Sequence, residues 1–96
     1  MIKTKKIKVG KKYIQALTMP LQSKSLVVLR GSRGYVMCGY LNLKAADKFK
    51  DVAIKITGAS SINDALNATA YSCSACAKKI GITKGIPIKD ILKVIV

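Results

Sequence analysis

Residues 25–57, SLVVLRGSRGYVMCGYLNLKAADKFKDVAIKIT, decide the fold, because they pass from strands to a helix and back to a strand. Residues 25–30 and 35–38 are apolar, β-rich runs on either side of a loop with glycine at both ends. After Asn42, a good N-cap, the apolar spacing becomes helical, and residues 52–57 return to a β-rich run. This order predicts an α/β (α+β) domain with a mixed sheet and helices packed on it.

Upstream, residues 5–9 and 12–18 predict two strands joined across Gly10-Lys11, since glycine at the first position of a two-residue loop suits a type II′ hairpin. Both faces of the second strand carry apolar side chains, so we expect it to be covered on both faces. Pro20 cannot donate to a ladder, which predicts a break in the sheet there.

Downstream, apolar residues at helical spacing predict one long helix that begins after Ser61 and ends before Gly81. Pro87 suits the first turn of a final helix. With no repeat and no linker, residues 1–96 are expected to form one domain, a three-layer sandwich.

The composition excludes several classes of chemistry. The 96 residues include no His and only 4 acidic side chains, and the formal net charge is +14. Without His there is no imidazole base and no mixed Cys/His zinc site, so we expect no metal and no cofactor. No apolar run approaches the length of a membrane span and no signal peptide is apparent, which predicts a cytoplasmic protein without membrane contact.

The positive charge is concentrated in the first half of the chain. It is densest at Lys3, Lys5, Lys6, Lys8, Lys11 and Lys12. Such a field attracts nucleic acid or another polyanion. Biased codon usage would also explain it, because Lys and Ile are both abundant, and the sequence leaves both explanations open.

Residues 34–39, Gly-Tyr-Val-Met-Cys-Gly, at the end of a strand and before a capped helix, resemble the signature of the YunC-like family, whose function is unknown. Lys84-Gly85 before a short terminal helix also matches the pattern, and the resemblance covers residues 7–96. It implies a compact α/β domain and tetramers assembled through an N-terminal β region, here the hairpin of residues 1–18. It implies no known reaction.

The same segment holds the candidate ligand site. It consists of Arg33, Gly34, Tyr35, Cys38 and Gly39. The loop of residues 30–34 has two possible interpretations. It forms either a backbone nest that binds a phosphate or a plain hairpin turn. Cys38 is a weak candidate nucleophile, against a role as a small buried hydrophobe.

Cys73 and Cys76 form a C-x-x-C pair, which we assign to the core, because the predicted helix places them far from its N-terminus. The sequence therefore favours a homo-oligomeric binding module for an anionic ligand or nucleic acid. An enzyme that uses Cys38 and a purely structural assembly protein are the alternatives.

Overall fold

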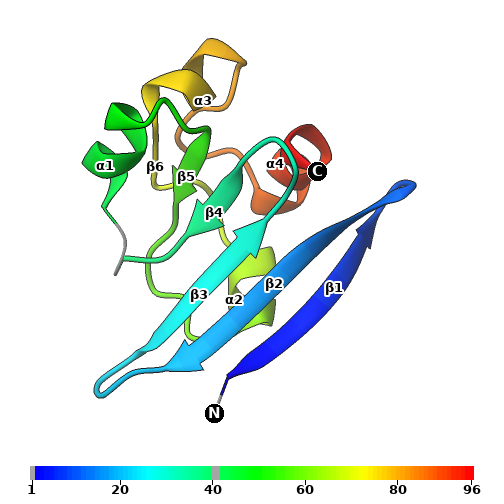
Figure 1. The fold of residues 1–96 in the computed structure, drawn as a ribbon, viewed down its shortest axis with the longest axis vertical. Coiled ribbons are helices and arrows are strands. Elements are labelled where there is room, and N and C mark those ends of the chain that lie inside the picture. The colour runs from blue at the N-terminus through cyan, green and yellow to red at the C-terminus, as the bar shows by residue number, and fades with distance from the viewer. Residues whose placement is uncertain (1, 40–41) are drawn as a thin grey trace.

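The structure, a computed structural model, describes residues 2–39 and 42–96, so Met1, Tyr40 and Leu41 lie outside the description. Within it, six strands form one sheet in chain order (Figure 1). They are β1 (Lys3–Val9), β2 (Lys12–Pro20), β3 (Ser25–Arg30), β4 (Tyr35–Met37), β5 (Ala53–Lys55) and β6 (Ser72–Cys73). Neighbouring strands are antiparallel except β4 and β5, which run parallel. The predicted mixed sheet is confirmed.

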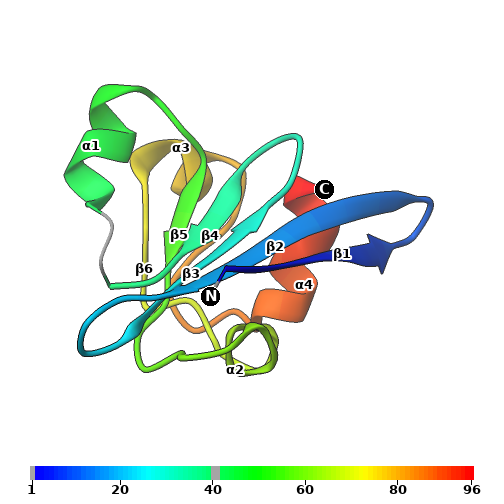
Figure 2. The same ribbon diagram turned by 60° about the horizontal axis from the view of Figure 1, so that its bottom comes forward.

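Helices cover both faces of this sheet (Figure 2). Helix α1 (Leu43–Lys48) packs over β4 and β5 on one face, where Ala46 meets Met37 and Ala53. The other face carries α2 (Ile62–Leu66), α3 (Ala75–Lys79) and α4 (Ile88–Ile95). The three layers agree with the predicted sandwich. No helix in the described part of the chain is long and apolar enough to cross a membrane.

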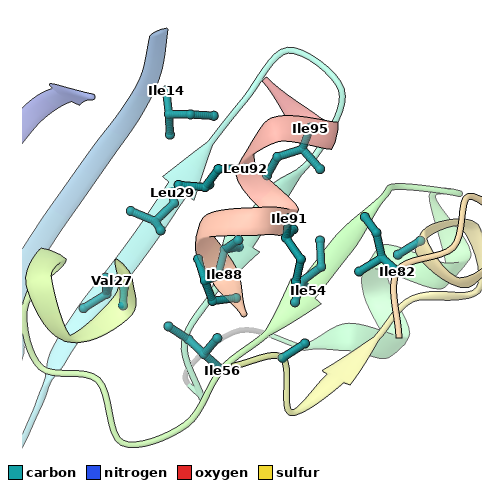
Figure 3. Close-up of a cluster of buried hydrophobic side chains, with 14 of the residues drawn as sticks. Ile14, Val27, Leu29, Ile54, Ile56, Ile82, Ile88, Ile91, Leu92 and Ile95 are labelled. Carbon is teal, nitrogen blue, oxygen red and sulfur yellow. The ribbon is translucent and has the colours of Figure 1, made fainter. Parts of the chain in front are cut away.

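The main core lies between the sheet and α4 (Figure 3). Its largest fully buried members are branched aliphatic side chains, Ile14, Leu29, Ile54, Ile56, Ile88, Ile91 and Ile95. Helix α4 supplies the residues at positions 88, 91 and 95, the face predicted from the sequence. Burial of this stripe on the sheet is what holds the C-terminal helix in place.

The N-terminal hairpin follows the prediction in its turn and departs from it at its end. Gly10 has φ 63°, as the first position of a type II′ turn requires, and Figure 1 shows the turn projecting beyond the helices. Strand β2 runs on to Pro20 instead of breaking there. Lys3 pairs with Thr18, so Pro20 lies past the end of β1 and no donor is needed on that side.

The expectation that β2 is covered on both faces is not met within one chain. Ile14 and Ala16 are buried under the helices, whereas Tyr13 and Gln15 point to the other face and are exposed. Helix α1 reaches only β4 and β5, so the second face of β1–β3 is open. This open face consists of Thr4, Lys6, Lys8, Tyr13, Gln15, Leu17, Met19, Leu26, Val28 and Arg30.

The long helix predicted after Ser61 is wrong. The segment folds as α2, the short strand β6 and α3. Between the helices the backbone bonds to other parts of the chain: Ala70 N–H donates to the Ile86 carbonyl at 2.9 Å, and Tyr71 N–H donates to that of Lys55 at 2.8 Å. These amides therefore do not donate to the carbonyl four residues earlier, as a continuous α-helix would require.

Ser74 explains why the chain turns helical again after β6. Its fully buried hydroxyl caps α3 by accepting from Ala77 N–H at 3.3 Å, and it also accepts from Ala53 N–H at 2.9 Å. The same hydroxyl donates to the Asp51 carbonyl at 2.7 Å. Ser74 thus starts α3 and ties it to β5. The predicted caps Asn42 and Ser61 both accept from their helices.

Candidate functional site

The loop between β3 and β4 was one candidate for phosphate binding, and its glycines have a packing role. A β-carbon on Gly31 would collide with the carbonyl of Ile95, and one on Gly34 would stand 2.6 Å from that of Val52. Gly31 N–H donates to the Gly34 carbonyl and Arg33 N–H donates to that of Ile95, both at 2.8 Å. One amide of the suggested nest is therefore used within the loop, and another docks the loop on α4.

A polar hollow of about 340 Å³ lies beside this loop. Its cations are Arg30, Arg33 and Lys50, and Asp51 is the carboxylate among its lining residues. Tyr35 Oη donates to Asp51 Oδ2 at 3.0 Å. Burial, followed by this hydrogen bond and the negative charge, raises the pKa of Tyr35 from 10.0 to about 12. Tyr35 is therefore a neutral donor at physiological pH and not a base.

Cys38 and Gly39 lie at the opposite end of β4 from Arg33 and Gly34. They line a separate crevice of about 680 Å³. Cys38 is buried, and its Sγ accepts a hydrogen bond from Val27 N–H at 3.4 Å. The structure thus divides the five residues of the predicted ligand site between two hollows, one at each end of a strand.

The six predicted polyanion-contacting lysines are all exposed, and the pleat of β1 divides them between two faces. Lys6 and Lys8 lie on the open face, beside Gln15 and Tyr13 of β2. Lys3, Lys5 and Lys12 lie on the opposite face, and Lys11 is in the turn. Of the six lysines, only Lys6 and Lys8 therefore lie on the open face.

The open face has a polar half and an apolar half, which sequence reasoning did not anticipate. Toward the hairpin turn it consists of Lys6, Lys8, Tyr13, Gln15 and Arg30, which we call the basic half. Tyr13 is 58% exposed, and Arg30 Nη1 donates to Gln15 Oε1 at 3.5 Å. Away from the turn it consists of Thr4, Leu17, Met19, Leu26 and Val28, which we call the apolar half. The register of β1, β2 and β3 places these side chains together, and the register between β2 and β3 was not predicted from the sequence.

The C-x-x-C pair does not sit inside a helix as predicted: Cys73 ends β6, and Cys76 is in the first turn of α3. Burial raises the pKa of Cys73, and the charge of Lys78 offsets this in part, so its thiolate is disfavoured. Cys73 is packed in the core. Among the described residues, no cluster of Cys and acidic side chains is suited to hold a metal ion.

The four carboxylates have structural partners within the fold. Asp47 accepts from Ala75 N–H at 2.7 Å, and Asp90 forms a 4.0 Å ion pair with Lys93. Asp64 accepts from both the backbone and the hydroxyl of Ser60, and the backbone bond is the main cause that lowers its pKa. Strands β1, β2 and β3 contain no acidic residue, and Asp51 lines the polar hollow together with Arg30 of the basic half.

Comparison with known proteins places the chain in a family. Residues 37–95 match a domain of unknown function, DUF1805. The chain belongs to this family. It is also similar to a crystal structure of a protein of unknown function from Thermoplasma acidophilum, with 31% identity, a TM-score of 0.96, and 100% of this chain and 94% of that one covered. No curated protein matches the chain.

The resemblance drawn from residues 34–39 is thus confirmed as far as a family of unknown function. The YunC-like assignment itself stays a prediction, as does assembly through the N-terminal hairpin. The DUF1805 match begins at Met37, so the open face of β1–β3 lies outside the matched residues. The structural neighbour, by contrast, covers that face as well.

Proposed function

We propose that this DUF1805 protein is a cytoplasmic binding module for single-stranded nucleic acid, which contacts the basic half of the open face. The observation that carries the proposal is an exposed aromatic ring, Tyr13, set among Lys6, Lys8 and Arg30 on three strands that contain no acidic residue. Lysines there attract phosphates, and the ring offers a face on which a base can stack.

The position of Tyr13 favours a single strand over a duplex. It is directly opposite Lys8, and the next pair along the hairpin is Gln15 and Lys6. Unpaired bases can stack on such a ring, which contributes about 1–3 kcal/mol per base. Bases in a duplex are already stacked, so duplex binding would draw on the phosphate contacts alone.

The apolar half supports the second element of the proposal, a homo-oligomer with the tetramer favoured. Leu17 and Val28 are half-buried and line a hollow of about 610 Å³ that no described residue fills. The hollow extends to Lys6, Gln15 and Arg30 of the basic half. A second copy seated on this half would bury these side chains and leave Lys8 and Tyr13 of the basic half accessible. The hairpin of residues 1–18 would then supply the interface.

The first test compares two doubly substituted proteins with the same change in charge. Lys6→Glu plus Lys8→Glu alters the basic half, whereas Lys89→Glu plus Lys93→Glu alters the exposed side of α4. A labelled single strand of mixed sequence and the matching duplex are titrated at ~50 and ~200 mM salt. We expect the first pair to lower the salt slope for the single strand by about 1.4, at about 0.7 per lost phosphate contact, and the control to leave it unchanged. An equal decrease of the salt slope in both proteins would mean that the overall positive charge attracts the single strand, and it would overturn the proposed site.

The second test separates stacking from charge. Tyr13→Ala should weaken single-strand binding about tenfold and leave duplex binding unchanged, because only the stacking contribution is lost. Tyr71→Ala is the control, since Tyr71 is 52% exposed, similar to Tyr13, but lies outside the open face.

Sedimentation of the Leu17→Lys protein tests the assembly. We expect a smaller species than the parent, and an unchanged size would contradict the interface.

A further inference from the structure

The crevice lined by Cys38 and Gly39 differs chemically from the open face. It lies where the parallel strands β4 and β5 both end, with Cys38 and Gly39 following one and Thr57 following the other. The β2–β3 turn supplies Ser23, Lys24 and Ser25. We propose that this crevice binds a small organic phosphate monoester. This site is separate from the open face and does not rest on the nucleic-acid proposal.

The lining favours an anion rich in acceptors. Ser23, Ser25 and Thr57 have hydroxyls that the hydrogen bonds among the described residues leave unused, and Lys24 brings an ammonium group. The described residues that line the crevice include no carboxylate. Hydroxyl and ammonium donors that line one crevice match the terminal oxygens of a phosphate group.

Ser60 is the lining hydroxyl that does not fit this role. Its Oγ donates to Asp64 Oδ2 at 3.0 Å, and its N–H donates to the same oxygen at 3.2 Å. Ser60 therefore presents lone pairs, and the Asp64 charge lies behind it. We place the phosphate group beside Lys24 and Ser25, where the free donors are.

The glycines of the crevice are unlike those of the β3–β4 loop. A β-carbon on Gly39 or Gly58 would meet no atom within 4 Å, whereas Gly31 and Gly34 have backbone in that space. Gly58 needs its glycine for φ 75°, but Gly39 has no positive φ. Among the described residues, packing and backbone conformation thus give no reason for a glycine at position 39, and its lack of a side chain keeps the crevice open for a ligand.

The size of the crevice argues for an organic phosphate over the bare ion. A volume of about 680 Å³ is within the range of small-molecule sites and far exceeds one phosphate group. The buried Cys38 thiol and half-buried Ala59 provide apolar surface for the organic part. Ligand sites in open α/β sheets commonly lie outside the carboxyl ends of parallel strands, as this one does.

The experiment follows backbone amide signals of the glycines by NMR during titration with phenyl phosphate, inorganic phosphate and benzyl alcohol. We expect phenyl phosphate to shift Gly39 and Gly58 saturably and to leave Gly31 and Gly34, at the far end of β4, in place. Inorganic phosphate should bind more weakly and benzyl alcohol not at all. Equal shifts at all four glycines, or none, would overturn the proposal, and equal affinity for inorganic phosphate would overturn its organic part.

Two variants complete the test. Lys24→Gln should weaken phenyl phosphate about tenfold, as loss of a charge-assisted hydrogen bond does, while the matched Lys11→Gln in the hairpin turn should not. Gly39→Val should block binding without unfolding the protein, because its side chain would enter open space. Lys6→Glu plus Lys8→Glu should leave phenyl phosphate unaffected, so failure of this site and failure of the nucleic-acid surface are distinguishable.

Discussion

The carbonyl oxygen of Ile95 occupies the space that a β-carbon on Gly31 would need. The same oxygen accepts a hydrogen bond from Arg33 N–H at 2.8 Å, so the β3–β4 loop and the end of α4 are in direct backbone contact. Gly31→Ala must push the two apart. We expect the free energy of unfolding to fall by about 1–3 kcal/mol, the usual cost of overpacking. Urea denaturation measures it.

Gly39→Ala is the matched control for this substitution. A methyl group there meets nothing within 4 Å, and the backbone does not have positive φ. Its stability should remain within about 0.5 kcal/mol of the parent. A loss as large as that of Gly31→Ala would mean that glycine content, and not the contact with Ile95, sets the cost.

The Ser74 hydroxyl is the polar centre of the C-terminal half. Ser74→Ala removes a helix cap and leaves buried groups of Ala53 and Asp51 without their partner. The expected loss is about 3 kcal/mol, from the cap and the unsatisfied buried groups together. Ser61→Ala removes only the cap of α2 and should cost about 1 kcal/mol. Thermal or urea unfolding of both proteins compares them, and equal losses would contradict the role assigned to Ser74.

Tyr35 gives the protein a stability change at high pH. Its pKa is raised to about 12, so the folded state favours the neutral phenol. This contribution is fully present below pH 10, the pKa of an ordinary tyrosine, and is lost as pH rises through 12. We expect a phenolate absorbance step near pH 12 that Tyr35→Phe lacks. Asp51→Asn should move that step to lower pH, because it removes the negative charge beside the ring.

The sequence was sufficient for the first five strands and the terminal helix but not for residues 62–80. Residues 62–80 were predicted as one helix because buried positions such as Ala70, Cys73 and Ala77 fall at helical spacing. Two short helices and a strand bury the same positions. What decides between them is the bonding of Ser74 to Asp51 and Ala53, which are distant in sequence.

The candidate site was predicted only in part, for a similar reason. Residues 34 to 39 are adjacent in sequence, but extended chain rises about 3.3 Å per residue, so the two glycines lie about 16 Å apart. Arg33 and Cys38 therefore reach different hollows. The partners of Cys38, among them Ser25 and Thr57, come from other strand ends, and only the sheet order brings them to it.

The three free cysteines should differ in reactivity according to their burial. Cys38 and Cys73 are buried, and burial also raises the pKa of Cys73, whereas Cys76 is half-buried. A thiol reagent should therefore modify Cys76 first in the folded protein and the other two on unfolding. Cys76→Ser should abolish the fast reaction and Cys73→Ser should retain it, as followed by mass spectrometry. Rapid modification of Cys38 in the folded protein would contradict this order and would mean that the reagent enters the crevice and reaches its thiol.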